Sequence, residues 1–229
     1  MISNRRMMSA ILPALVLALV VVATVPAVAS EWAGHNGVIR LSFTSGDTLT
    51  STLDRAPETP VGVMVDLYAV LTDVDQVHWN SGKVIALGGF ELMLTAVGAE
   101  MQIMNTEYDV KCFDLGKEKG QCMVGFFPDL SLRDGPATLV HWKLLLKGDP
   151  HNVVFSLDPA GLVSCTGLTD CADSGSYALW AGSKIADQAG LLFSAGYTPA
   201  YLNWEGETDL SVVKGTGDWL EVGKVELKE

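Results

Sequence analysis

The feature that most constrains this chain is a series of short apolar runs with period-two alternation. Every second residue from Val140 to Leu146 is apolar, and His141 and Lys143 stand between them. Phe90, Leu92, Leu94 and Ala96 repeat the pattern. Such alternation is typical of a strand with one buried face. Further candidate strands lie at residues 38–44, 61–71, 110–113, 122–127, 153–157, 162–165, 176–181, 210–213 and 219–227.

Turn-forming residues separate these runs at intervals of roughly ten residues, which indicates many short antiparallel strands. Gly alone supplies 23 of the 229 residues. The only helical candidate, residues 185–192, is short and contains Gly190. The sequence therefore predicts an all-β antiparallel β-sandwich of the immunoglobulin-like or jelly-roll type with little helix. A closed barrel is the alternative.

The first 29 residues have the three zones of a secretory signal peptide. Arg5 and Arg6 give a positive start, residues 10–25 are mostly apolar, and Ala27 to Ala29 form a small-x-small cleavage motif. An apolar helix of this length reaches about 24 Å, short of the roughly 30 Å hydrocarbon core. We expect cleavage after Ala29 and export to the periplasm or the exterior of a bacterial-type cell. The Arg pair is also compatible with a twin-arginine signal, although its flanking residues fit poorly.

The expected mature chain, residues 30–229, is long enough for a single sandwich domain and shows no linker or strong repeat. Loss of Arg5 and Arg6 leaves 13 basic side chains against 27 acidic ones. Such an acidic surface repels nucleic acid and anionic lipid, so neither is an expected partner. No later segment is long and apolar enough to predict a membrane span after cleavage.

Four cysteines in an exported chain predict two disulfide bonds. Sequence proximity favours Cys112–Cys122 and Cys165–Cys171 among the three possible pairings. Metal ligation is the rival, but no pair has the two-residue spacing of a zinc knuckle and no histidines lie nearby.

Besides the signal peptide and the layout of the strands, two short segments of this chain resemble those of known proteins. The segment Pro60-Val61-Gly62-Val63 and the strand start Gly88-Gly89-Phe90-Glu91 resemble those of secreted β-sandwich proteins of environmental bacteria. More distantly, the layout is similar to cohesin and carbohydrate-binding sandwich modules. The resemblance implies a cohesin-like fold. It assigns no functional residues, because those secreted proteins have no established activity.

Enzyme motifs are absent from the sequence. It contains no Gly-x-Ser-x-Gly elbow and no HExxH motif, and its four histidines are scattered. Acidic residues could supply a glycoside hydrolase pair, but a chain with 27 acids offers such pairs by chance, and a solvated acidic surface accounts for them better. Calcium binding is a better explanation of the oxygen-rich segments around residues 73–76 and 170–174. The candidate ligands for a structural calcium ion are Asp73, Asp75, Asp170 and Asp173; no other cofactor is predicted.

Six tryptophans offer a second class of site, because aromatic rings stack on sugar rings and anchor interfaces. Trp142 and Trp180 alternate with polar neighbours and are expected in the core, whereas Trp79 and Trp204 have polar surroundings. The candidate ligand-binding residues are Trp79, Tyr197, Tyr201 and Trp204. The sequence thus favours a secreted, non-enzymatic module that binds a glycan or an extracellular protein. A structural component of an extracellular assembly and a sandwich-fold glycoside hydrolase remain as alternatives.

Overall fold

The structure is a computed structural model that describes residues 37–57, 61–79, 82–158, 178–181, 191–193 and 196–213. Over these residues the chain forms fifteen strands and one short 3-10 turn, η1 (Val74–Gln76). No helix among the described residues meets the length and apolarity that crossing a bilayer requires.

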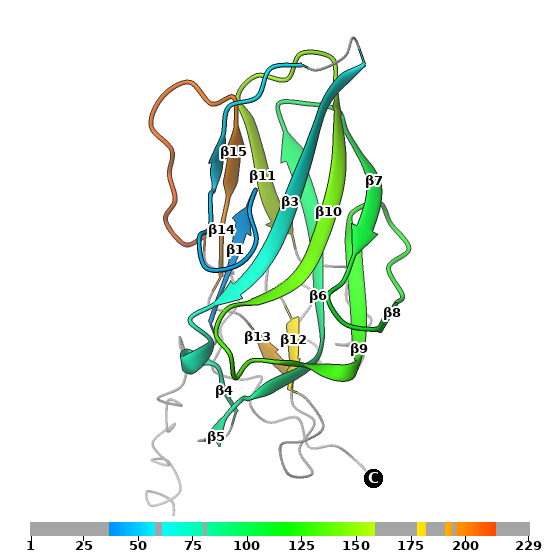
Figure 1. The fold of residues 1–229 in the computed structure, drawn as a ribbon, viewed down its shortest axis with the longest axis vertical. Helices are drawn as coiled ribbons and strands as arrows, with labels where there is room; N and C mark the ends of the chain where they lie inside the picture. The colour runs from blue at the N-terminus through cyan, green and yellow to red at the C-terminus, as the bar shows by residue number, and fades with distance from the viewer. Residues whose placement is uncertain are drawn as a thin grey trace, which may run out of the picture. The chain divides into compact units, whose positions relative to one another are not determined.

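The strands form two large sheets that face each other, and a two-stranded hairpin, β4 (His78–Trp79) with β5 (Gly82–Lys83), lies apart from them (Figure 1). Sheet A has the order β14-β1-β3-β10-β7. Its strands are β14 (Tyr197–Thr198), β1 (Val38–Ser42), β3 (Gly62–Thr72), β10 (Ala137–Lys147) and β7 (Met101–Glu107).

Sheet B is built around β6 (Ala86–Val97), which pairs with β9 along one edge. Along the other edge β6 pairs with β12 and then with β11, and β11 continues to β15 and β2. β8 pairs with β9 and is an edge strand of the described sheet. The remaining strands are β2 (Thr52–Leu53), β8 (Cys112–Asp114), β9 (Gln121–Ser131), β11 (Val153–Asp158), β12 (Ala178–Ala181), β13 (Leu191–Phe193) and β15 (Ala200–Leu202).

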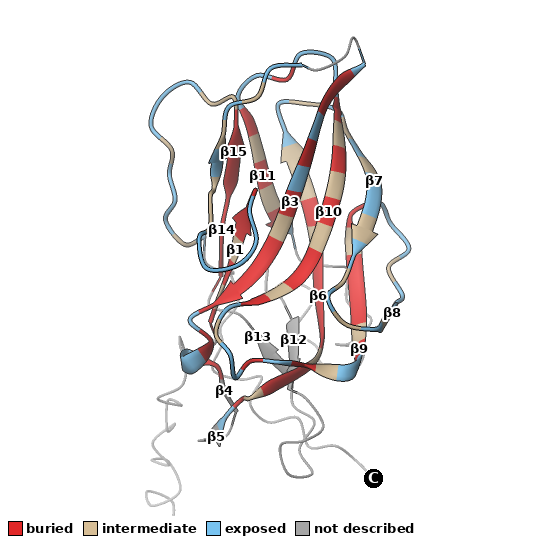
Figure 2. Cartoon of the chain, viewed as in Figure 1, coloured by how far each residue is buried: buried red, intermediate tan, exposed pale blue. Residues whose placement is uncertain are grey.

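One hydrophobic core joins the inner faces of the two sheets. Trp142, Leu144 and Leu146 of β10 are fully buried, and the residues between them are partly exposed, as Figure 2 shows along the strand. Phe90 and Leu92 of β6 are buried in the same cluster. The period-two pattern therefore builds the predicted sandwich, because each strand places alternate side chains between the sheets.

Several details of the strands differ from the sequence prediction. Each sheet contains a parallel pair, β1 with β14 and β2 with β15, whereas only antiparallel strands were expected. The edge strand β7 was not predicted, because only Met101, Ile103 and Thr106 along it are partly buried. The predicted strand at 210–213 is reduced to one bridge between Val213 and Tyr197. The candidate strands at 162–165 and 219–227 and the helical candidate at 185–192 lie outside the described residues, apart from Leu191 and Leu192 in β13.

The predicted Cys112–Cys122 disulfide is wrong, because both residues are free thiols. Cys112 lies opposite Phe126 in the β8–β9 ladder, so Cys122 is four positions further along β9. That offset corresponds to roughly 13 Å at strand rise, beyond the roughly 7 Å limit for the Cα atoms of a disulfide. Burial raises the pKa of the Cys122 thiol to about 12, so it stays protonated and unreactive. Cys165 and Cys171 lie outside the described residues.

Candidate functional site

The predicted ligand-binding residues fall in three different environments. Tyr197 on β14 and Tyr201 on β15 are each 7% exposed, and Trp204 after β15 is half-buried. The structure brings Tyr201 and Trp204 together, with ring centroids 5.1 Å apart at 62°. Trp79 is in β4, and its side chain, like that of Trp180, lies outside the described part of the structure. Trp142 is fully buried, as predicted.

Trp204 lines an open pocket of about 440 Å³, which we call the Trp204 pocket. Three loops form it: residues 54–57 after β2, Asp149 and His151 between β10 and β11, and residues 203–205 after β15. These loops are far apart in the sequence and meet because β2 and β11 flank β15 in sheet B. The volume is within the range of about 300–1,000 Å³ typical of small-molecule sites.

Two asparagines join the three loops. The side chain of Asn203 accepts a hydrogen bond from the Arg55 backbone N–H (2.7 Å) and donates to the carbonyls of Arg55 and Pro150 (both 2.9 Å). Asn152 accepts a hydrogen bond on its side chain from the Glu205 N–H at 2.7 Å. Both asparagines have positive φ, 48° and 52°, a conformation that asparagine tolerates better than most residues.

Charged side chains surround the aromatic wall of this pocket. Asp54, Asp149 and Glu205 are the acidic residues, and Arg55 and His151 are the basic ones. His151 lies 3.1 Å from a carboxylate oxygen of Asp149 in an exposed pair. Such a rim offers hydrogen-bond donors and acceptors beside an aromatic ring.

The calcium candidates do not form a site that can be recognised in the described residues. Asp73 caps η1 and Asp75 lies within it, and both are exposed. Asp170 and Asp173 lie outside the described residues. Within the described part of the chain, no three His, Cys, Asp or Glu side chains are arranged to hold a metal ion.

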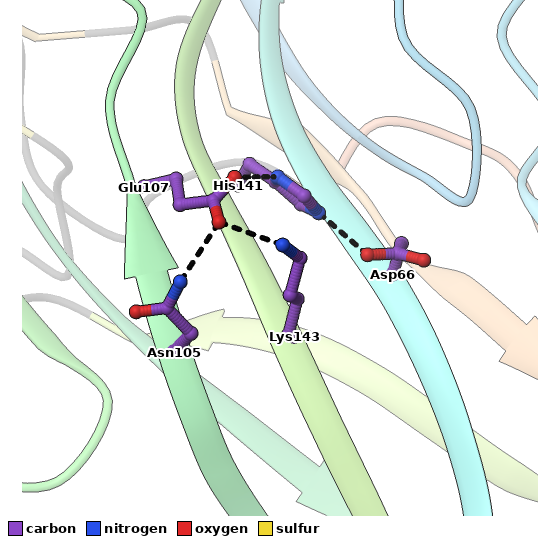
Figure 3. Close-up of polar contacts among 5 residues, drawn as sticks. All are labelled: Asp66, Asn105, Glu107, His141 and Lys143. Carbon is purple, nitrogen blue, oxygen red and sulfur yellow. Dashed lines mark hydrogen bonds and ion pairs between the residues drawn. The ribbon is translucent and has the colours of Figure 1, made fainter.

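A polar network covers the outer face of sheet A, and the sequence analysis did not predict it. His141 of β10 lies between two carboxylates, with Nε2 2.8 Å from Asp66 on β3 and Nδ1 3.1 Å from Glu107 on β7 (Figure 3). Lys143 and Asn105 donate to the other Glu107 oxygen at 2.7 and 2.8 Å. Both His141 nitrogens can donate at once only when the ring is protonated.

Stacking and electrostatics hold this network in place. The ring of Tyr68 stacks on His141 with centroids 4.2 Å apart and an interplanar angle of 11°. The hydrogen bond from Lys143 holds the pKa of Glu107 below its ordinary value, and the same bond raises the pKa of Lys143. The register explains the arrangement, since Tyr68, His141 and Glu107 are direct cross-strand neighbours.

The β8–β9 hairpin presents the opposite kind of surface. Phe113, Leu115 and Phe127 are 59%, 58% and 79% exposed, and we call these three side chains the hairpin face. Cys122, Val124 and Phe126 of β9 are in the core, so alternation places Gly125 and Phe127 on the outside of sheet B. Phe113 of β8 is paired with Gly125 and shares that side, as does Leu115 two residues later. The Phe113 ring lies on Gly125, where an added Cβ would come within 2.3 Å of it.

The backbone of this hairpin is held by side-chain hydrogen bonds. One oxygen of Asp114 accepts from the N–H groups of Gly116 (2.8 Å) and Met123 (3.1 Å), and the other accepts from the Tyr108 hydroxyl at 2.5 Å. The Gln121 side chain accepts from two further N–H groups in the turn. The exposed aromatic rings therefore project from a fixed support.

Comparisons with known proteins give fold neighbours. The seventh ScaB type I cohesin of Pseudobacteroides cellulosolvens is 11% identical, with a TM-score of 0.45, over 77% of this chain and 96% of that one. A cohesin module from a family 33 glycoside hydrolase of Clostridium perfringens ATCC13124 is 13% identical, with a TM-score of 0.31, over 74% and 100%. Both of these solved structures are cohesin modules, the group whose resemblance the sequence analysis noted. No family model and no curated protein matches the chain.

Proposed function

We propose that this chain is a secreted, non-enzymatic binding module that recognises a protein partner through the hairpin face. The observation that carries the proposal is the exposure of Phe113, Leu115 and Phe127 on one side of a rigid edge hairpin. Aromatic side chains are enriched in the centres of protein interfaces. Clustered exposed apolar side chains mark binding surfaces more often than single ones do.

Charge near the hairpin indicates what kind of partner fits. Lys111, Lys117 and Lys119 lie on the hairpin, in a chain whose acidic residues otherwise far outnumber its basic ones. The hairpin also holds Asp114, Glu118 and Asp129, of which Asp114 accepts three hydrogen bonds, from Tyr108, Gly116 and Met123. The partner we propose is therefore a folded protein with an apolar contact surface and an acidic rim.

The proposal also states where the partner is found and that the function is non-catalytic. The signal-like first 29 residues support export, so the partner is an extracellular or cell-surface protein. No catalytic step is part of this function. A structural role in an extracellular assembly is the alternative, and it requires that the same face binds a second copy of this chain.

The test uses residues 30–229, purified and immobilised, to capture extracellular proteins of the producing organism. Captured proteins are identified, produced separately and titrated against the module by calorimetry. Replacing both Phe113 and Phe127 by Ser is expected to weaken binding of the purified partner by at least about thirtyfold, the effect of losing about 2 kcal/mol. Binding is also expected to weaken as salt concentration rises.

Met104→Ser is the matched control, because Met104 is 52% exposed at a bulge of sheet A and lies outside the hairpin. It is expected to leave the affinity unchanged. Equal affinity of the double Phe variant and the wild-type chain would refute the assigned surface. Sedimentation of the chain as an oligomer that the double variant dissociates would favour the structural alternative instead.

A further inference from the structure

We propose that the Trp204 pocket binds a neutral pyranose unit of a glycan. This inference goes beyond the proposed function, because the pocket lies beside β15 and β2, whereas the hairpin face lies at the β8 edge of sheet B. The two sites can therefore be occupied and tested independently.

The pocket is preorganised by hydrogen bonds that join its three loops. Asn203 makes three side-chain hydrogen bonds to two other loops, and its N–H and carbonyl bind Leu53 and Asn152 at 2.9 Å each. Asn152 in turn binds Glu205. Three loops held together in this way keep their shape before a ligand arrives, which lowers the entropic cost of binding.

The aromatic wall is also held in place. The Trp204 indole donates from Nε1 to the Glu207 carbonyl at 3.1 Å, and its ring contacts the edge of Tyr201. Tyr201 is in turn anchored by its hydroxyl, which donates to the Asp209 carbonyl at 2.7 Å. A half-buried indole fixed against a pocket provides a flat apolar surface for the C–H face of a sugar ring.

The polar rim selects the sugar class. The carboxylates of Asp54, Asp149 and Glu205 are acceptors for sugar hydroxyl groups, and the His151 imidazole is a donor. Three acidic groups against one permanent cation disfavour a ligand that carries its own carboxylate or sulfate. Because a pyranose combines an apolar face with a ring of hydroxyls, a neutral hexose or pentose polymer fits both halves of the pocket.

The experiment titrates residues 30–229 with cellohexaose, xylohexaose, mannohexaose and maltohexaose, with oligogalacturonate as the charged counterpart. Calorimetry and tryptophan fluorescence report binding. At least one neutral oligosaccharide is expected to bind, and oligogalacturonate is expected to bind at least about tenfold more weakly. Trp204→Ala is expected to weaken the neutral ligand at least about tenfold, and Trp204→Phe is expected to restore part of that loss.

Two controls separate this inference from others. The Phe113→Ser/Phe127→Ser variant should retain full sugar binding, so failure of the protein-partner proposal leaves this one intact. Thermal unfolding of each Trp204 variant shows whether the fold is preserved. Absence of binding by every neutral oligosaccharide at millimolar concentration would overturn the inference, as would unchanged affinity in a folded Trp204→Ala variant.

Discussion

The outer faces of the two sheets differ in whether their side chains have partners within the chain. On sheet A, His141, Asp66, Glu107 and Lys143 form hydrogen bonds and ion pairs with one another across three strands. On the hairpin of sheet B, by contrast, apolar side chains are exposed to solvent on a backbone that is itself well braced.

This difference separates a surface that completes the fold from one that is available for binding. A polar network with its own partners gains little from a second protein, because its groups would have to exchange existing hydrogen bonds. Exposed aromatic rings gain from any partner that removes them from water. The comparison therefore predicts that substitutions on sheet A change stability, whereas those on the hairpin face change binding.

The largest expected effect tests the close approach of β9 to Gly89 in sheet B. An added Cβ at Gly89 would lie 2.2 Å from the Val124 carbonyl oxygen, a backbone atom that cannot move aside. Gly89→Ala is expected to lower the free energy of unfolding by about 1–3 kcal/mol, measured by urea denaturation. In Gly125→Ala the obstacle is the Phe113 ring, which can rotate away. A smaller loss is expected there, and equal losses would show that the ring is fixed by the fold.

The next effect concerns the network on sheet A. His141→Ala removes the contacts with Asp66 and Glu107 and the stack on Tyr68, and is expected to cost about 1 kcal/mol of unfolding free energy. His151→Ala is the control, since its pair with Asp149 is exposed and contributes little to stability. If the two variants unfolded at the same urea concentration, the network would have no stabilising role.

A smaller change is expected on the hairpin face. Phe113→Ser and Phe127→Ser should each alter unfolding free energy by less than about 0.5 kcal/mol, since exposed positions are tolerant. Chemical denaturation of the single variants provides the measurement. A cost comparable to that of a buried phenylalanine would mean that these rings belong to the chain's own packing, and the contrast between the faces would fail.

The smallest effect is a pH dependence of the Glu107–Lys143 pair. The pKa of Glu107 is lowered below 4.5 mainly by the hydrogen bond from Lys143, so its contribution is present above the unfolded-state pKa and lost as pH falls through the folded-state value. Glu107→Gln is expected to flatten the decline of stability in acid, and Lys143→Gln should do the same. The measurement is the urea midpoint of the wild-type chain and of both variants from neutral to acidic pH. Superimposable pH profiles for the three chains would contradict the prediction.

Much of the fold could be predicted because the buried positions follow a period of two. β6, β10 and β11 each lie where alternation places them. β7 was missed because it lies at the edge of sheet A and presents polar Gln102 and Asn105 to solvent. β14 and β15 were missed because they have two and three residues, too few to show any period.

The candidate sites were less accessible to sequence reasoning. Trp204 was predicted from its polar neighbours, but the brace formed by Asn203 and Asn152 depends on loops about fifty residues apart. Adjacent Phe126 and Phe127 look alike in sequence, and only the register of β9 decides that one is 6% and the other 79% exposed. The network around His141 was not predicted, since its two carboxylate neighbours come from other strands.

The two parallel pairings have a consequence for how the protein is made. β1 pairs with β3 early in the chain but gains its second neighbour only from β14, and in the described sheets β2 pairs only with β15, so both wait for residues near 200. Closing such distant pairs is slow, because long loops must be ordered before any contact forms. Neither sheet therefore reaches its full set of strands until the residues near 200 have been made.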